Sequence, residues 1–159
     1  MVMSTDQPSG MAPLATLNQR FLARLVDTVV LIVIDVLVSV VVYGDDLSSP
    51  TDAGGGKQAV ATVVTFVVYF LYEGFMTAAR GQTLGKRMLK IRAARLVDGE
   101  VPGGDGWTRA AVYALPGAFG VVLVGPLFWL LNSLWCLWDR PYRQCLHDKA
   151  AKTVVVAAV

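Results

Sequence analysis

The chain has 159 residues, of which 55% are hydrophobic and only 16% are charged, and its mean hydropathy is +0.54. A soluble domain carries about a quarter charged residues, so this composition excludes an ordinary soluble domain and indicates a one-domain integral membrane protein. The net charge of +2 and the dissimilar surroundings of Cys136 and Cys145 give no support to nucleic-acid binding or to a disulfide framework.

Residues 1–19 are predicted to form a disordered N-terminal lead, because they contain Pro8, Ser9, Gly10 and Pro13. An apolar stretch follows two arginines directly after this lead, which is also a feature of signal peptides. The stretch is too long for a signal peptide and has no small-residue cleavage site after it. We therefore expect it to stay in the protein.

Two apolar stretches, residues 21–43 and 59–79, are predicted to span the membrane. The first has 23 residues and would be about 35 Å long as a helix, enough to cross a hydrocarbon core of about 30 Å. The loop between them, GDDLSSPTDAGGGK, holds three acids and one base.

A third apolar block covers residues 110–138 and contains Pro116, Gly117, Gly120, Gly125 and Pro126. A helix with prolines and glycines at these positions is not expected to be straight. Two interpretations stay open, namely one kinked span and a hairpin of two short half-helices that meet near Gly125-Pro126.

Charge predicts the orientation of these spans. Residues 77–109 hold seven Lys and Arg against three acids, and residues 139–159 hold four Lys and Arg. By the positive-inside rule, segments 80–109 and 139–159 and the N-terminus are expected in the cytoplasm of a multi-pass protein of the bacterial plasma membrane. An even number of crossings then favours the hairpin.

A small β element is expected within the cytoplasmic segments. Residues 90–97 read as a strand, Asp98-Gly99 as a tight turn, and the EVP that follows as a short return strand. The Val-rich residues 153–159 are too short to span a membrane and are expected to pair with the strand over residues 90–97.

Two carboxylates, Asp27 and Asp35, lie inside the first predicted span, and Glu73 lies near the cytoplasmic end of the second. Each Asp costs roughly 2.5–3.5 kcal/mol at the centre of an inserted helix, so it needs a reason. In one interpretation Asp27 forms a structural ion pair with Arg20 and Arg24 on the same helix face, and Asp35 bonds to a neighbouring helix. In the other interpretation, both acids belong to an ion or proton pathway. Glu73 is expected to be structural.

The segment GQTLGKR resembles a nucleotide-binding loop but has only three residues between its glycines, and Arg87 replaces the Ser or Thr that such loops require. We expect a tight turn that leaves the second span, with Lys86 and Arg87 anchored at lipid headgroups. The members of this membrane-surface motif are Gly81, Thr83, Gly85, Lys86 and Arg87.

The segment RQCLHDKAAKTVVV contains His147, which is the only histidine, so no catalytic Ser/His/Asp set and no metal site can be assembled. His147 is expected to be an interfacial histidine, with a proton shuttle as the alternative. Asp148 is expected to pair with Arg143, Arg20 or Arg24.

Three segments, RFLARLVD, GQTLGKRMLKIRAARLVDGEVP and RQCLHDKAAKTVVV, together resemble the RDD family of bacterial membrane proteins, which is named for one arginine and two aspartates. The resemblance covers residues 20–156. It assigns the arginine to Arg20, the first aspartate to Asp27, and the second to Asp148, with Asp139 as the alternative. The family's GxTxGK pattern falls on Gly81, Thr83, Gly85 and Lys86.

The expected fold is an all-α membrane protein with two transmembrane helices, a kinked or hairpin third block and a small cytoplasmic β element. The resemblance implies a transporter of a cation or small solute, with cation/proton antiport suggested for some members. Asp27 and Asp35 would then bind the ion or proton, Arg20 and Arg24 would tune their pKa values, and Asp148 would complete the cluster.

Three or four helices can hardly enclose a cation path, so a homo-oligomer or a membrane partner is expected. The rival interpretation is a non-transporting membrane adaptor or assembly factor, in which the same charges are structural ion pairs. We expect no enzymatic activity, no cofactor, no metal and no nucleic-acid partner, with the lipid bilayer as the surroundings.

Overall fold

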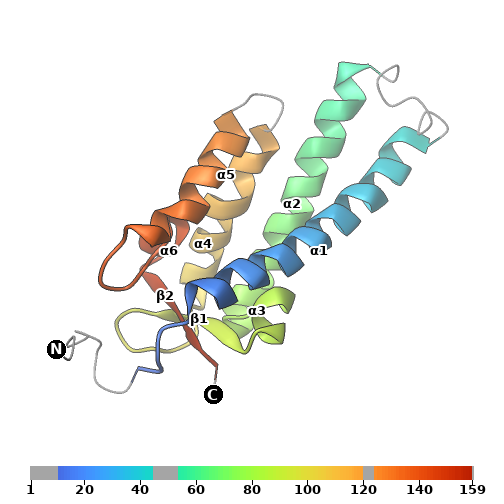
Figure 1. The fold of residues 1–159 in the computed structure, drawn as a ribbon. Coiled ribbons are helices and arrows are strands. Elements are labelled where there is room, and N and C mark those ends of the chain that lie inside the picture. The colour runs from blue at the N-terminus through green and yellow to red at the C-terminus, as the bar shows by residue number, and fades with distance from the viewer. Residues whose placement is uncertain (1–10, 45–53, 120–123, 159) are drawn as a thin grey trace.

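The computed structural model describes residues 11–44, 54–119 and 124–158. Two long helices, α1 (Leu17–Tyr43) and α2 (Gly55–Arg80), lie beside a pair of shorter helical legs, and a two-stranded sheet lies at one end of the molecule (Figure 1). The expected class, an all-α membrane protein with a small β element, is confirmed.

Helix α1 begins at a capping box, in which the Thr16 hydroxyl accepts from the Gln19 amide at 3.2 Å and the Gln19 side chain accepts from the Thr16 amide at 3.0 Å. Its buried residues recur every three or four positions, at Arg20, Ala23, Asp27 and Leu31. Most of the rest of its surface is apolar and exposed or half-buried, as expected for a helix with one face in the protein and the others in lipid.

Helix α2 buries a similar narrow face and ends at Gly81, whose φ of +68° places it in the left-handed region that favours glycine. Both long helices are long and apolar enough to cross a membrane. Only 11% of the most apolar window of α1 and 28% of that of α2 are buried, whereas a core helix of a soluble protein would be mostly buried.

The third apolar block forms two legs. The first is α4 (Gly104–Ala114) continued by the 3₁₀ helix η2 (Leu115–Phe119), and the second is α5 (Val124–Leu134) continued by η3 (Trp135–Leu137). The legs run side by side in opposite directions (Figure 1), and the Trp129 indole donates to the Tyr113 carbonyl at 2.6 Å. The interpretation as one kinked span is therefore wrong. Gly125 and Pro126, near which the two half-helices were expected to meet, lie within the first turn of α5, and residues 120–123 between the legs lie outside the described residues.

Strands β1 (Ile91–Arg95) and β2 (Thr153–Ala157) pair antiparallel, with Ile91 opposite Ala157 and Arg95 opposite Thr153. This confirms the pairing predicted between the basic segment and the Val-rich tail. The predicted return strand does not form. Instead the Arg95 amide donates to the Glu100 carbonyl at 2.9 Å, which closes a turn without a ladder beyond it.

Part of the predicted disordered lead is ordered. The Ala15 amide donates to the Val155 carbonyl at 3.0 Å, and the Ala157 amide donates to the Pro13 carbonyl at 2.8 Å. Strand β2 has a second edge, and residues 13–15 occupy it while Ala15 packs into the core. Residues 1–10 of the predicted lead lie outside the described residues.

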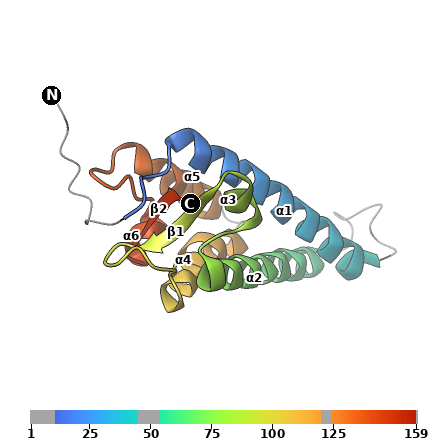
Figure 2. The same ribbon diagram turned by 90° about the horizontal axis from the view of Figure 1, so that it is seen from below.

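Two short helices, α3 (Leu84–Met88) and α6 (Leu146–Ala150), complete the fold. Viewed from below, α3, α6 and both strands gather under the same end of the long helices (Figure 2). Segments from the beginning, middle and end of the chain therefore meet there, and this is where the buried charges lie.

Candidate functional site

Asp27 is fully buried and faces α3 rather than the arginines of its own helix. One carboxylate oxygen accepts from the Thr83 hydroxyl at 2.6 Å, and the other accepts from the Gly85 amide at 3.0 Å. The ion pair expected between Asp27 and Arg20 or Arg24 is wrong, because no such pair forms among the described residues. The approach of α3 explains the difference, since a side chain at Gly85 would collide with the Ala23 carbonyl oxygen.

The GQTLGKR segment builds this contact. Gly81 ends α2, and the Thr83 side chain caps α3 by accepting from the Lys86 amide. Lys86 is only 3% exposed, and its ammonium lies 3.2 Å from the Thr83 hydroxyl and 3.7 Å from Glu73 Oε1. The expected headgroup anchor is therefore wrong for Lys86, whose chain turns inward toward an acid, while Arg87 is exposed.

Glu73 on α2 is the centre of the network. Its Oε1 lies 3.0 Å from Arg24 Nη1, 3.4 Å from Arg109 Nη1 and 3.7 Å from Lys86 Nζ. Its Oε2 is buried and has no hydrogen-bond partner among the described residues. One carboxylate thus holds together α1, α2, α3 and α4, which agrees with the structural role expected for Glu73.

Asp148 is 1% exposed and pairs with Arg109, at 2.7 Å between Oδ1 and Nε. Its other oxygen accepts from the Cys145 amide at 3.2 Å and caps α6. Burial would raise the pKa of Asp148, but Arg109 and further cations outweigh it and hold that pKa below its ordinary value. The ion-pair partners expected for Asp148 from the sequence are wrong.

Arg109 was missed because the predicted third block began only after it, at residue 110. Helix α4 instead begins at Gly104, so Arg109 lies in its middle and packs against α2 and α6. The available signal was a lone arginine directly before the apolar run AAVYAL. An arginine there is costly in an apolar helix unless acids from other elements meet it.

His147 is buried rather than interfacial, with 2% exposure. Its Nδ1 lies 2.8 Å from Asn132 Oδ1, and its Nε2 lies 3.1 Å from Arg24 Nη2 and 3.0 Å from Arg109 Nη2. Both guanidinium groups can only donate, so Nε2 accepts and Nδ1 carries the proton. Burial, together with the neighbouring arginines, lowers the pKa of His147 well below its ordinary value and favours the neutral ring. The proton shuttle stays a prediction.

Arg20 forms no ion pair with an acid of the described residues. Its Nη1 donates to the Arg143 carbonyl at 2.5 Å and its Nη2 to the Val155 carbonyl at 2.9 Å, so it joins α1 to the C-terminal segment. Its Nε is buried and has no hydrogen-bond partner among the described residues. The charge of Arg20 is therefore solvated by carbonyl dipoles and is not cancelled by an ion pair.

Asp35 does not join the network. It lies two turns along α1, is exposed on the outer surface, and accepts from the Thr65 hydroxyl of α2 at 3.0 Å. This is the bond to a neighbouring helix that one of the sequence-based interpretations anticipated.

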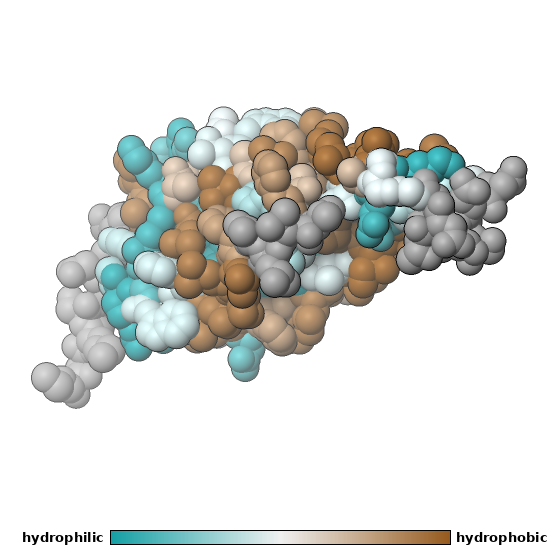
Figure 3. Space-filling model, turned by 90° about the horizontal axis from the view of Figure 1, so that it is seen from above, coloured by the Kyte–Doolittle hydropathy of each residue, from teal (hydrophilic) through white to brown (hydrophobic). Residues whose placement is uncertain are grey.

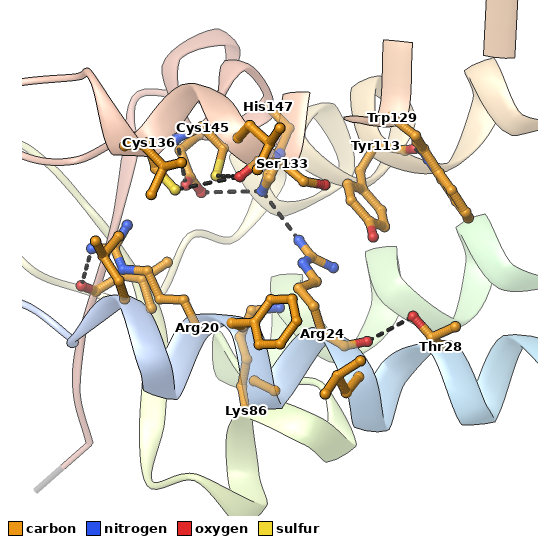
Figure 4. Close-up of a pocket in the computed structure, with 18 of the residues that line it drawn as sticks. Arg20, Arg24, Thr28, Lys86, Tyr113, Trp129, Ser133, Cys136, Cys145 and His147 are labelled. Atoms are coloured by element: carbon orange, nitrogen blue, oxygen red, sulfur yellow. Dashed lines mark hydrogen bonds and ion pairs between the residues drawn. The ribbon is translucent and has the colours of Figure 1, made fainter. Parts of the chain in front are cut away.

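A cavity of about 650 Å³ lies beside the network, between α1 on one side and α5, η3 and α6 on the other. In Figure 4, Arg24 reaches from α1 across it toward His147, while Cys136, Cys145 and Ser133 lie on the opposite wall. Its volume is typical of a small-molecule site. Its charged lining consists of four bases, Arg20, Arg24, Lys86 and Arg109, and one acid, Asp148, whereas most of its other walls are apolar.

A metal ion does not fit this cavity. Cys145, His147 and Asp148 bring their possible ligand atoms within 4.8 Å of one another. However, His147 Nε2 already accepts from two guanidinium groups, and Asp148 is paired with Arg109. A cation there would have to displace arginines that the fold holds in place.

The sequence model of the RDD family matches residues 14–152. The chain belongs to the RDD family. No curated protein and no solved structure matches it. Family membership and the two apolar helices make this RDD chain a membrane protein.

All three residues that the resemblance assigned to the RDD name lie around the cavity or in the adjoining network, namely Arg20, Asp27 and Asp148. The alternative, Asp139, lies outside it and pairs with Lys149. The geometry thus favours Asp148 over Asp139 as the member of the buried cluster.

Proposed function

We propose that this RDD protein binds a small anionic solute in the cavity between α1 and α5, as the binding step of a transporter. The observation that supports this is a charge imbalance beside the cavity. Among the described residues, the network contains four bases, Arg20, Arg24, Lys86 and Arg109, against three acids, Asp27, Glu73 and Asp148, and all of these are buried except Arg24, which is 18% exposed.

Lys86 can remove the surplus positive charge by losing its proton when the site is empty. Burial, reinforced by Arg109 and Arg24, lowers the pKa of Lys86 to about 7. The network therefore carries between zero and one net positive charge at neutral pH. An uncompensated charge out of water costs several kcal/mol, and a bound anion would offset that cost. Guanidinium groups also match the geometry of phosphate and carboxylate oxygens.

The cation route expected through Asp27 has less support. Both oxygens of Asp27 already accept bonds from Thr83 and Gly85, and a cation would have to enter a cavity lined by arginines. Asp35 lies away from the cavity, so the two acids do not form one path. We therefore propose an anion rather than a cation as the small solute.

The protein is proposed to lie in the bacterial plasma membrane as a multi-pass chain with a cytoplasmic N-terminus. The basic segment with α3 and β1, the C-terminal strand and the buried network share one end of the molecule, which the positive-inside rule assigns to the cytoplasm. Two long helices and two short legs do not enclose a path across a bilayer, so transport would require a homo-oligomer or a membrane partner.

The alternative is a membrane adaptor or assembly factor, and the observation in its favour is the network itself. Glu73, Arg109 and Asp148 tie α1, α2, α3, α4 and α6 together, which a scaffold would need as much as a transporter. We propose no enzymatic activity and no cofactor.

The test is uptake of radiolabelled anion or cation into proteoliposomes, with an internal pH-sensitive dye to report any coupled proton movement. Inorganic phosphate and butanesulfonate would be compared with Na⁺, K⁺ and Li⁺, for wild type, Arg24→Met and the exposed control Arg87→Met. Anion uptake that Arg24→Met abolishes and Arg87→Met retains is the expected result. Flux that depends on cations alone would contradict the proposal, and no flux from correctly inserted protein would favour the adaptor.

A further inference from the structure

We infer that the cavity takes a single-chain anionic amphiphile from the membrane, with its phosphate or carboxylate head at the arginines and its tail between α1 and α5. The inference rests on the proposed anion binding and names the class of ligand.

The mouth of the cavity opens on the apolar exterior. Phe21 and Leu25 of α1 line the cavity and are also 65% and 48% exposed on the outer surface. Leu130 and Leu134 of α5 line the facing wall of the cavity and are 58% and 39% exposed. Because α1 is long and apolar enough to span the membrane, these exposed rows face lipid.

The outer surface of the molecule is largely apolar as well. Figure 3, seen from above, shows apolar residues over much of this face and most of the hydrophilic ones toward its ends. A ligand that enters between α1 and α5 would therefore come from the hydrocarbon region more readily than from water.

The inner end of the cavity is suited to an acidic head. Arg24 lines it, with its guanidinium 3.8 Å from the centre of the Tyr113 ring and 3.0 Å from Glu73. Arg20 also lines it, is more than nine-tenths buried, and has a buried Nε without a hydrogen-bond partner among the described residues. A buried donor left unbonded costs roughly 1–3 kcal/mol, which an acidic oxygen would recover.

The shape of the cavity supports a chain behind the head. Its lining on α1 runs from Leu17 to Thr28, which corresponds to about 16 Å along a helix. On the other side, Pro126, Leu130 and Leu134 follow one another at four-residue intervals along a single face of α5. An inorganic ion would fill only a small part of this length, whereas one alkyl chain would lie along both rows. The single surplus base of the network matches one acidic head.

The test is a titration of the full chain in nanodiscs of zwitterionic lipid, with empty nanodiscs subtracted. Decyl phosphate, inorganic phosphate and decanol would each be added, and isothermal calorimetry and tryptophan fluorescence would report binding. We expect decyl phosphate to bind at least tenfold more tightly than inorganic phosphate, and decanol to bind no better than inorganic phosphate.

Two pairs of variants locate the head and the tail. Arg24→Gln should weaken the binding of both decyl phosphate and inorganic phosphate. The exposed Arg87→Gln is its control. Leu130→Trp narrows the groove and should weaken decyl phosphate tenfold or more while leaving inorganic phosphate unchanged. Its control is Leu131→Trp, an exposed neighbour that does not line the cavity.

The outcomes separate this inference from the proposed function. Equal binding of decyl phosphate and inorganic phosphate, both lost in Arg24→Gln, would overturn the amphiphile and leave anion binding standing. Head-group recognition would be overturned if Arg24→Gln left the affinity for decyl phosphate unchanged, or if decanol bound as tightly as decyl phosphate. No binding of either phosphate to folded protein would overturn both proposals.

Discussion

At the scale of single residues, the buried charges differ in how many partners they have. Among the described residues, Glu73 meets three bases through one oxygen, Asp148 meets Arg109, and Asp27 accepts only from neutral donors. Arg20 donates only to carbonyls of that part of the chain. Removing Glu73 or Asp148 therefore leaves bases unpaired in a low dielectric, whereas removing Arg20 relieves an imbalance.

Glu73→Gln should destabilise the fold strongly. The change leaves Arg24 and the buried Lys86 and Arg109 facing a neutral amide, and breaking a buried ion pair on one side costs about 3–5 kcal/mol. Thermal unfolding in detergent, followed by circular dichroism, would measure the loss. The exposed control Glu100→Gln should stay within about 0.5 kcal/mol of wild type. Equal melting of both variants would contradict the network.

Binding of an anion should weaken as the pH rises through 7. Lys86 faces Glu73 of α2, Arg109 of α4 and Arg24 and Asp27 of α1, and its pKa of about 7 lies below that of a free lysine. Below pH 7 the protonated ammonium adds the surplus charge, and above pH 7 the neutral amine removes it. Linkage then limits the loss of affinity to about tenfold per pH unit.

Butanesulfonate suits this measurement because it keeps one charge across the pH range. Calorimetric titrations from pH 6 to pH 8.5 should show the loss for wild type, while Lys86→Met should bind weakly and without this pH dependence. His147 stays neutral and Asp148 stays ionised over that range, since their pKa values are both lowered. A flat profile for wild type would remove Lys86 from the anion site.

Residue identities alone could indicate the buried acids but not their partners. Asp27 and Asp148 stood out, one for its cost in an apolar span and one for the family resemblance. Arg109 and the donors Thr83 and Gly85 come from segments that lie far from α1 in sequence. Which base meets which acid depends on how α3 and α4 pack, and no spacing within one helix contains that information.

At the scale of elements, α1 and α3 approach each other closely, with no room for a side chain at Gly85. Gly85 faces the Ala23 carbonyl, and the Asp27 carboxylate stabilises this contact by accepting from the Gly85 amide. The GQTLGKR segment is thus a docking turn for α1 and not a phosphate-binding loop or a pair of headgroup anchors.

Gly85→Ala should therefore push α3 away from α1. The added methyl group collides with backbone atoms that cannot move aside as a flexible side chain would, and overpacking of this kind costs about 1–3 kcal/mol. The matched control is Gly104→Ala at the start of α4, where an added Cβ meets nothing within 4 Å. A melting temperature of Gly85→Ala equal to that of Gly104→Ala would contradict this packing.

Elements whose patterns are local were predicted well. The two long helices follow from unbroken apolar runs, and the β1–β2 pair follows from Val-rich and basic segments of suitable length. Residues 13–15 and the early start of α4 were missed, because each depends on a partner elsewhere. The edge of β2 orders the first, and Glu73 and Asp148 stabilise Arg109 in the second.

At the scale of the whole molecule, the charged network, the sheet and both short helices lie at one end, and the apolar helices extend from it (Figure 1). This division follows the charge pattern of the sequence and explains why the basic segments were expected on one side of the membrane. It also brings the cavity to the boundary between the network and the apolar helices.

The proposed orientation can be tested by labelling introduced cysteines in a background where Cys136 and Cys145 are Ser. Val97→Cys lies exposed in the basic segment and should react with an impermeant maleimide only after the cells are opened. Gly55→Cys, exposed at the start of α2, should react in intact cells. The reverse pattern would place the N-terminus outside.

The most direct test of the anion site is calorimetric binding of butanesulfonate to the reconstituted protein at pH 6.5, with wild type, Arg24→Met and Arg87→Met in parallel. We expect saturable binding with one site per chain, weakened at least tenfold by Arg24→Met and unchanged by Arg87→Met. Binding of equal strength in all three proteins, or none to a correctly folded wild type, would contradict the proposal that the buried bases bind an anion.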